Sequence, residues 1–232
     1  MVEALLRRSR RGLETDRMAA ALRYAAMGWP VCPGAQASVP PSRHLRPSLA
    51  SRGYVREVGR ACSCDRIGCP APGAHPVSPA WQIEASADPA DVGRWWRERP
   101  RASIILVTGR VFDVLDVPVR AGAVALAAMN SAGTRPGPVA VGPEDRAYFF
   151  VVTRGTPAHA DEWWSCHLDC EPGIEQASGL RWHCRDSYVV APSPGGGRLP
   201  AVGWVCEPGE YSLPDALRLI GFLTDACDGV MR

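Results

Sequence analysis

Three cysteines and one histidine cluster in a stretch that reads CSCDRIGCPAPGAHP, residues 62–76. Three thiolates and one imidazole at this spacing form the ligand set of a closed, four-coordinate structural zinc site. Gly68, Pro70, Pro72 and Gly73 interrupt any helix or strand here, so we expect a loop that a bound metal would help to fold. The alternative is a group of ordinary thiols in a cysteine-rich chain. The predicted zinc loop spans residues 61–76, and its ligands are Cys62, Cys64, Cys69 and His75.

The N-terminal residues favour a metal over disulfide bonds. They read MVEALLRRSRR and lack the apolar core and the cleavage site of a signal peptide. Thiols stay reduced in chains that are not exported, so we expect a cytoplasmic protein with metal-bound cysteines. No apolar run approaches the roughly 20 residues needed to cross a bilayer, and no membrane association is expected.

Positive charge is concentrated at the start of the chain. Residues 1–60 hold eleven arginines and four acids, a net charge of +7, whereas residues 61–232 hold fifteen arginines and twenty acids, a net charge of −5. This asymmetry suits contact with a polyanion, although a solvated basic tail has the same composition. The chain contains no lysine, which excludes a P-loop NTPase and a lysine Schiff-base enzyme.

The order of the predicted elements indicates an α+β fold. Apolar spacing and stop signals predict helices over residues 15–28, 88–99, 122–133 and 212–229, the last capped by Ser212. Strands are predicted over residues 102–109, 111–119, 137–152 as a pair, 178–190 as a pair, and 202–208. This order implies a mixed, largely antiparallel sheet covered by helices.

The domain organisation follows from the same pattern. A basic extension over residues 1–17 precedes a single domain over residues 18–232, which contains a flexible insertion rich in proline, serine and arginine at residues 34–60. A second metal group is a weaker hypothesis, because Cys166, His167 and Cys170 have no fourth ligand at local spacing.

Several segments, taken in order, resemble a known family. They read ALRYAAMGWPVCPG, CSCDRIGCPAPGAHP, PAW, DPADVGRWWRERPRASIILVTG, VLDV, RAYFFVV and SYVVAPSP. From about residue 20 to residue 206 the chain is similar to the N-terminal domain of bifunctional DNA primase/polymerases, the prim-pol branch of the archaeo-eukaryotic primase superfamily. The resemblance implies an RRM-like sheet that carries the active site, with a zinc-binding loop beside it. It also implies templated nucleotide joining, in which paired carboxylates hold Mg²⁺ or Mn²⁺. DNA or RNA and a helicase or other replication protein are the implied partners.

The chain departs from this family at the catalytic positions. Asp116 stands where the first metal-binding carboxylate belongs, but Pro118 occupies the second position and offers no ligand atom. Ala147 stands where the family has a histidine that contacts nucleotide phosphate, and Arg181 where a further acid is expected. Asp113 does not replace the missing acid, because strand residues three positions apart point to opposite faces.

The leading hypothesis is therefore a catalytically degenerate domain that binds nucleic acid or a protein partner. Asp116 is expected to pair with Arg146 or Arg181 and to have little affinity for Mg²⁺. One alternative is an active, metal-dependent DNA primase/polymerase, and a second is a protein-interaction module without a nucleic-acid role. The arginines predicted to contact phosphate are Arg7, Arg8, Arg10, Arg11, Arg146 and Arg181.

Overall fold

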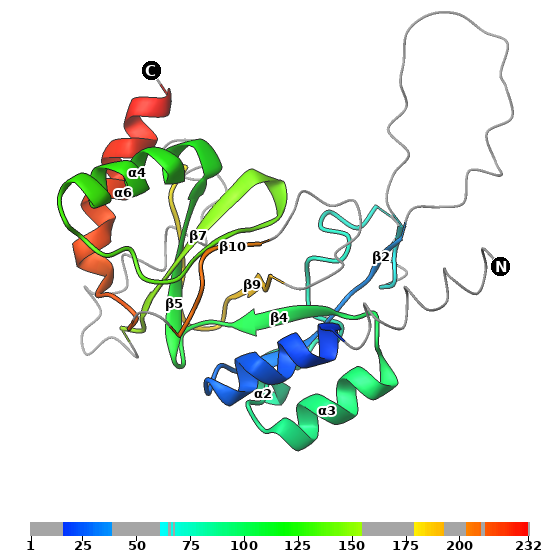
Figure 1. Cartoon of the computed structure of the whole chain (residues 1–232). Coiled ribbons are helices and arrows are strands. Elements are labelled where there is room, and N and C mark those ends of the chain that lie inside the picture. The colour runs from blue at the N-terminus through cyan, green and yellow to red at the C-terminus, as the bar shows by residue number, and fades with distance from the viewer. Residues whose placement is uncertain are drawn as a thin grey trace, which may run out of the picture.

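The computed structural model describes residues 16–38, 61–64, 66, 68–154, 179–192, 203–209 and 212–231. These residues form a five-stranded sheet, a three-stranded sheet and a short two-stranded ribbon (Figure 1). Every strand pairing within these ranges is antiparallel. The predicted α+β class is confirmed, although the strands divide between separate sheets rather than forming one.

The five-stranded sheet is built around two long central strands. Its strands are β5 (Phe112–Pro118), β6 (Val139–Val141), β7 (Arg146–Val152), β8 (Arg181–His183) and β10 (Gly203–Cys206). They lie in the order β10-β6-β7-β5-β8. β5 and β7 pair along seven residues and are rich in the β-branched and aromatic residues that suit a buried strand. The predicted pair around the polar turn is confirmed as β6 and β7, joined by the 3₁₀ turn η2 (Pro143–Asp145).

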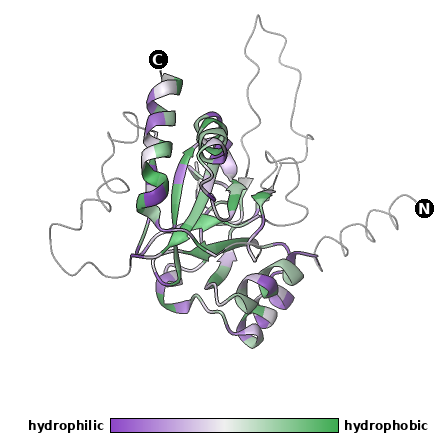
Figure 2. Ribbon diagram, turned by 60° about the vertical axis from the view of Figure 1, so that its left-hand side comes forward, coloured by the Kyte–Doolittle hydropathy of each residue, from purple (hydrophilic) through white to green (hydrophobic). Residues whose placement is uncertain are grey.

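Two helices cover one face of this sheet. They are α4 (Val119–Ser131) and α6 (Ala216–Met231), which lie side by side in Figure 1. Leu115, Val117 and Phe149 from the strands are fully buried in one core with residues of both helices. Figure 2 shows mostly hydrophobic strands and helices with both hydrophobic and hydrophilic sides, as expected when a helix shields a sheet from water. The opposite face of the sheet packs against the rest of the domain.

The three-stranded sheet packs against that opposite face. Its strands lie in the order β1-β4-β9, with β1 (Val31–Gly34), β4 (Ser103–Val107) and β9 (Tyr188–Val190). The helix of residues 16–26 and α3 (Pro89–Glu98) contribute to its core, and α2 (Trp81–Glu84) is a short turn beside it. The Trp29 ring stacks on Phe150 of β7 with centroids 5.2 Å apart and lies 4.5 Å from Phe112 of β5. One hydrophobic core therefore joins both sheets.

The chain crosses between the two sheets at two turns that pack together. The predicted pairing of the strands over residues 178–190 is wrong, because β8 pairs with β5 while β9 pairs with β4. Between them, the carbonyl of Cys184 accepts a hydrogen bond of 2.6 Å from Thr108 Oγ1. A Cβ added at Gly109, whose φ is +80°, would lie 2.2 Å from the backbone of Arg185. This close approach holds the turn after β8 against the turn before β5.

Helix capping agrees with the sequence at one helix and differs at another. Asp88 caps α3 as predicted, since its carboxylate accepts a 2.7 Å hydrogen bond from the N–H of Ala90. The prediction that Ser212 caps the last helix is wrong. α6 starts at Ala216, and the carboxylate of Asp215 accepts a 2.7 Å hydrogen bond from the N–H of Leu217, because a capping side chain must directly precede the first turn. Among the described residues, none of the helices has the length and apolarity needed to cross a membrane.

Candidate functional site

The predicted metal loop is fastened at both ends to the chain that leaves β1. On one side, β2 (Ala37–Ser38) pairs with β3 (Ala61–Cys62). On the other side, the N–H of Ala35 donates to the carbonyl of His75 over 2.8 Å, and the N–H of Val77 donates to the carbonyl of Pro33 over 3.0 Å. Residues 34–38, at the start of the predicted insertion, therefore form part of this scaffold. Residues 39–60 lie outside the described residues.

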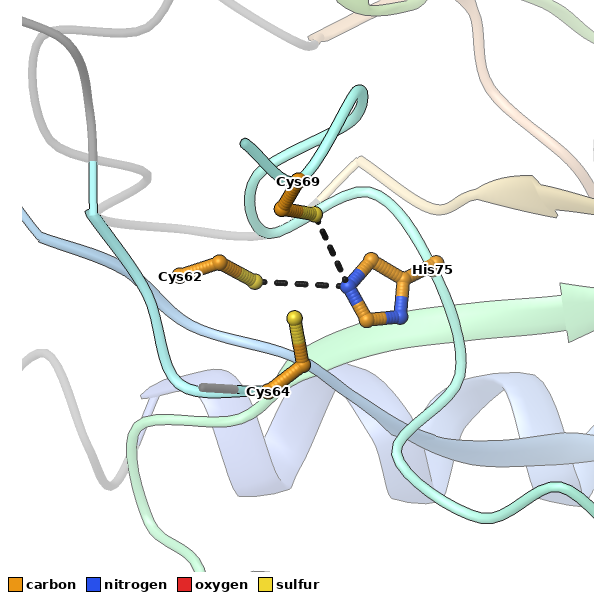
Figure 3. A group of neighbouring side chains, drawn as sticks. All are labelled: Cys62, Cys64, Cys69 and His75. Atoms are coloured by element: carbon orange, nitrogen blue, oxygen red, sulfur yellow. Dashed lines mark hydrogen bonds between the residues drawn. The ribbon is translucent and has the colours of Figure 1, made fainter. Parts of the chain in front are cut away.

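The four predicted ligands converge. The side chains of Cys62, Cys64, Cys69 and His75 point toward one another (Figure 3), and one ligand atom from each lies within 4.8 Å of the others. Sulfur ligands of a tetrahedral zinc ion with Zn–S bonds of 2.3 Å lie about 3.8 Å apart, so only a small contraction would complete the site. The cluster could hold a metal such as zinc.

His75 presents the correct nitrogen to this cluster. Its Nδ1 lies 2.8 Å from the carbonyl of Pro76, which can only accept a hydrogen bond, so Nδ1 carries the proton. The lone pair of Nε2 then faces Cys62 Sγ at 3.3 Å and Cys69 Sγ at 3.5 Å. A backbone acceptor behind the second ring nitrogen is the usual way in which proteins orient a metal-binding histidine.

The thiol groups have the electrostatics of a cation site. Burial raises the pKa of the Cys62 thiol, but hydrogen bonds from the backbone of Cys64 and Gly73 and from the side chain of His75 outweigh it and lower the pKa to about 6. The pKa of Cys69 is raised, because desolvation and the neighbouring Cys64 and Cys62 disfavour a second thiolate. A divalent cation would neutralise this crowding, so the donor set fits Zn²⁺.

The second candidate site surrounds Asp116, in the middle of β5. Its side chain is only 2% exposed, and both carboxylate oxygens have partners. Arg146 Nε donates to Oδ1 over 2.6 Å, and His183 Nε2 lies 3.2 Å from Oδ2. The pairing of Asp116 with a nearby arginine, predicted from the sequence, is confirmed for Arg146. The carboxylate is thus enclosed by a guanidinium and an imidazole.

Both partners of Asp116 are themselves fixed. The Nη2 of Arg146 donates to the backbone carbonyls of Asp116, at 3.1 Å, and of Gly179, at 2.6 Å. The other ring nitrogen of His183 lies 3.0 Å from Ser187 Oγ, in the turn that leads to β9. These contacts hold the ion pair in one arrangement and turn the Arg146 side chain inward.

Strand register shows which other predicted residues share this face of the sheet. Asp116 lies opposite Arg181 of β8 and opposite Tyr148 of β7, and Pro118 lies opposite Arg146. Cross-strand partners project from the same face, so Arg181 and Pro118 belong with Asp116. Because β5 pairs with β8, Asp116 and Arg181 are direct cross-strand neighbours.

Ala147 lies on the opposite face. It is opposite Val117 in the register and is buried in the core beneath α4. A Cβ added at Gly122 of α4 would lie 2.6 Å from the Cβ of Ala147, so no larger side chain fits there. The strand position that faces Asp116 near the end of β7 is Arg146, one residue before the position inferred from the family pattern.

Asp113 also lies away from Asp116, which confirms that the two acids point to opposite faces. Its Oδ2 accepts hydrogen bonds from Trp182 Nε1, at 3.3 Å, and from the N–H of Arg154, at 3.4 Å. Burial raises the pKa of this carboxyl group, and these hydrogen bonds only partly offset the effect. Asp113 therefore cannot supply the second metal ligand.

Sequence reasoning missed the role of His183 beside Asp116. The sequence could have indicated this role, because residues two positions apart in a strand share a face. His183 therefore lies on the same face as Arg181, which is opposite Asp116. The arginines at positions 7, 8, 10 and 11 and the second predicted metal group, Cys166, His167 and Cys170, lie outside the described residues.

A comparison with protein families identifies the domain. The family model described as bifunctional DNA primase/polymerase, N-terminal, matches residues 21–216, which include both candidate sites. No curated protein matches the chain. Because the match covers most of the sequence, the chain belongs to the Prim-Pol family, the N-terminal domain of bifunctional DNA primase/polymerases.

Proposed function

We propose that this Prim-Pol domain binds nucleic acid but does not join nucleotides by a two-metal mechanism. The observation that carries the proposal is the enclosure of Asp116, whose oxygens bind Arg146 and His183. Two-metal catalysis requires carboxylate oxygens that are free to clamp cations between the attacking and leaving groups. Among the described residues of this sheet face, Asp116 is the one acid, and Arg146 neutralises it.

A divalent cation would bind poorly at this position for two reasons. Mg²⁺ requires near-octahedral oxygen ligands at 2.0–2.1 Å. The next residue of β5 on the same face as Asp116 is Pro118, whose side chain has no ligand atom. A cation would also have to displace Arg146, whose guanidinium makes three hydrogen bonds to Asp116 and Gly179. The arginine occupies the place of the metal electrostatically, and the remaining site is nearly neutral.

Nucleic-acid binding would then rely on arginine contacts to phosphate. Arg146 is committed to Asp116, so the proposed contacts are the four arginines of residues 1–12. Arginine binds phosphate oxygens in a bidentate manner and needs no metal. The metal loop, with zinc on Cys62, Cys64, Cys69 and His75, would have a structural role, because four protein ligands leave no open position for catalysis.

The first test is primer extension. We expect no product from a primed single-stranded DNA template with deoxynucleotides and either Mg²⁺ or Mn²⁺. Template-dependent product that disappears in an Asp116→Ala variant would overturn the proposal in favour of an active polymerase.

The second test is salt-dependent binding of fluorescently labelled single-stranded DNA. For about four phosphate contacts, affinity should fall roughly 50-fold between 50 and 200 mM salt. Replacing Arg7, Arg8, Arg10 and Arg11 with alanine should flatten this dependence, while replacing the exposed Arg218 of α6 should not. Undetectable binding at low salt would favour a domain that binds a protein partner, such as a helicase.

A further inference from the structure

A groove beside α3 has no role in the function proposed above. It has a volume of about 690 Å³, within the range of small-molecule sites. One wall is the segment directly after the metal loop, and the other is the C-terminal half of α3. We define the α3 groove by six of its lining residues, Val77, Ser78, Glu84, Trp95, Glu98 and Arg99. An adjoining pocket of about 40 Å³ shares Val77, Ser78 and Trp95 with the groove and is also lined by Cys32 and Pro33 of β1.

The groove contains charged groups that nothing else uses. Glu84, Glu98 and Arg99 are exposed, and their side chains make no hydrogen bond or ion pair within the described ranges. Asp91 and Arg94 also line the groove, but they neutralise each other across a 2.7 Å salt bridge. The groove thus presents two carboxylates and one guanidinium to a ligand.

Trp95 supplies an aromatic surface. Its neighbour Trp96 is 1% exposed and donates from Nε1 to the carbonyl of Ala102 over 3.4 Å, so Trp96 belongs to the core. Trp95 is only half-buried; it packs against the core and also lines the groove. The two adjacent tryptophans therefore have different roles, and Trp95 has ring surface available for stacking.

We infer that the α3 groove binds a nucleotide, with its base stacked on Trp95. A nucleotide combines a flat ring for the indole, N–H donors for Glu84 and Glu98, and a phosphate for Arg99. Guanine offers a ring N–H and an exocyclic amino group to carboxylates, whereas thymine offers one N–H between two carbonyls. The groove should therefore prefer guanine to thymine. A purely cationic ligand would pair with the carboxylates but would leave Arg99 without a counter-charge.

This site lies on a different part of the domain from Asp116 and involves no catalysis. It extends the proposed nucleic-acid role by adding a contact to a base, but a free mononucleotide can test it without any oligonucleotide binding. Failure of the groove would leave the backbone contacts of the arginines intact, and failure of the backbone contacts would leave the groove intact.

The test is calorimetric titration of the full chain with dGMP, dTMP and deoxyribose 5-phosphate. We expect saturable binding of dGMP, weaker binding of dTMP and none of deoxyribose 5-phosphate. Arg99→Ala should weaken dGMP binding about tenfold. The matched control is Arg97→Ala in α3. The Arg97 side chain donates to the backbone carbonyl of Gly93 in that helix, so this variant should bind dGMP as the unaltered chain does.

Two further variants examine the base. Trp95→Ala should weaken dGMP binding about tenfold or more, and Glu98→Gln should bring the affinities for dGMP and dTMP closer together. Because Trp95 contacts the core, the exposed Glu98 and Arg99 variants keep the test valid if Trp95→Ala unfolds. The inference is overturned by an absence of saturable dGMP binding, by equal effects of Arg97→Ala and Arg99→Ala, or by tighter binding of a short arginine peptide than of dGMP.

Discussion

Asp116 lies in the middle of β5 with its carboxylate enclosed by Arg146 and His183. The backbone there is ordinary strand, and side chains alone make the ion pair. Removing one partner of a buried ion pair typically costs about 3–5 kcal/mol because the other charge is left buried and unpaired, so Arg146→Ala should destabilise the domain. Of the four residues grouped from the sequence, Asp116, Pro118 and Arg181 share a face in the strand register, and Ala147 lies on the other face, because neighbouring strand positions project to opposite faces.

The second acid of β5 gives a prediction about pH. Burial raises the folded-state pKa of Asp113 above its usual value, so the folded state binds this proton more readily than the unfolded chain. Stability from this group is therefore greatest below the unfolded pKa of about 3.8 and is lost as the pH rises through the folded pKa. Asp113→Asn should raise the melting temperature at pH 7, and the gain should vanish near pH 3.5. A variant that is less stable at pH 7 would contradict this account.

At the scale of elements, the metal loop shows how a segment with almost no core of its own can be held in place. Hydrogen bonds to residues 33–38 fix both of its ends, and four convergent side chains occupy its interior. The ligand set was predictable because it is local in sequence. The scaffold was not, because residues 34–38 lack any periodic pattern and pair with residues more than twenty positions away.

The metal gives a second prediction. Purified protein should carry about one zinc per chain by elemental analysis, and His75→Ala or Cys69→Ser should lose it, because a three-ligand site binds structural zinc weakly. Cys206→Ser, on β10 and outside the cluster, is the matched control and should keep the metal. Because Val77 and Ser78 follow the loop directly and line the α3 groove, metal removal should also weaken dGMP binding. Zinc retained by His75→Ala would disprove the ligand assignment.

Across the whole molecule, one core links two sheets that the sequence did not separate. Individual strands were predictable from their apolar runs, but β8 and β9 were assigned to one hairpin. The chain passes from one sheet to the other between β8 and β9, where the turn at residues 184–187 packs against the turn at residues 108–111. These two turns are far apart in sequence, so no local pattern predicts their contact. Trp29 joins the sheets through Phe112 and Phe150.

This arrangement gives a third prediction. Trp29→Ala should cost about 3–5 kcal/mol and should lower the protection of β4 and β5 together, as measured by hydrogen exchange. Loss of protection in β4 alone would mean that the sheets fold as separate units and would contradict a single domain over residues 18–232. Ile83→Ala, which removes a side chain that is 86% exposed on α2, is the control and should leave the stability unchanged.

The central claim is that an arginine has replaced the catalytic metal at Asp116, and Mn²⁺ binding tests it most directly. Titration of the full chain with Mn²⁺, followed by electron paramagnetic resonance, should reveal no tight site, and Asp116→Ala should give the same titration curve as the unaltered chain. Because Arg146 neutralises Asp116 over 2.6 Å, free Mn²⁺ should remain in solution at micromolar concentrations. A stoichiometric site with micromolar affinity that disappears in Asp116→Ala would show that the carboxylate still holds a metal and would contradict the account.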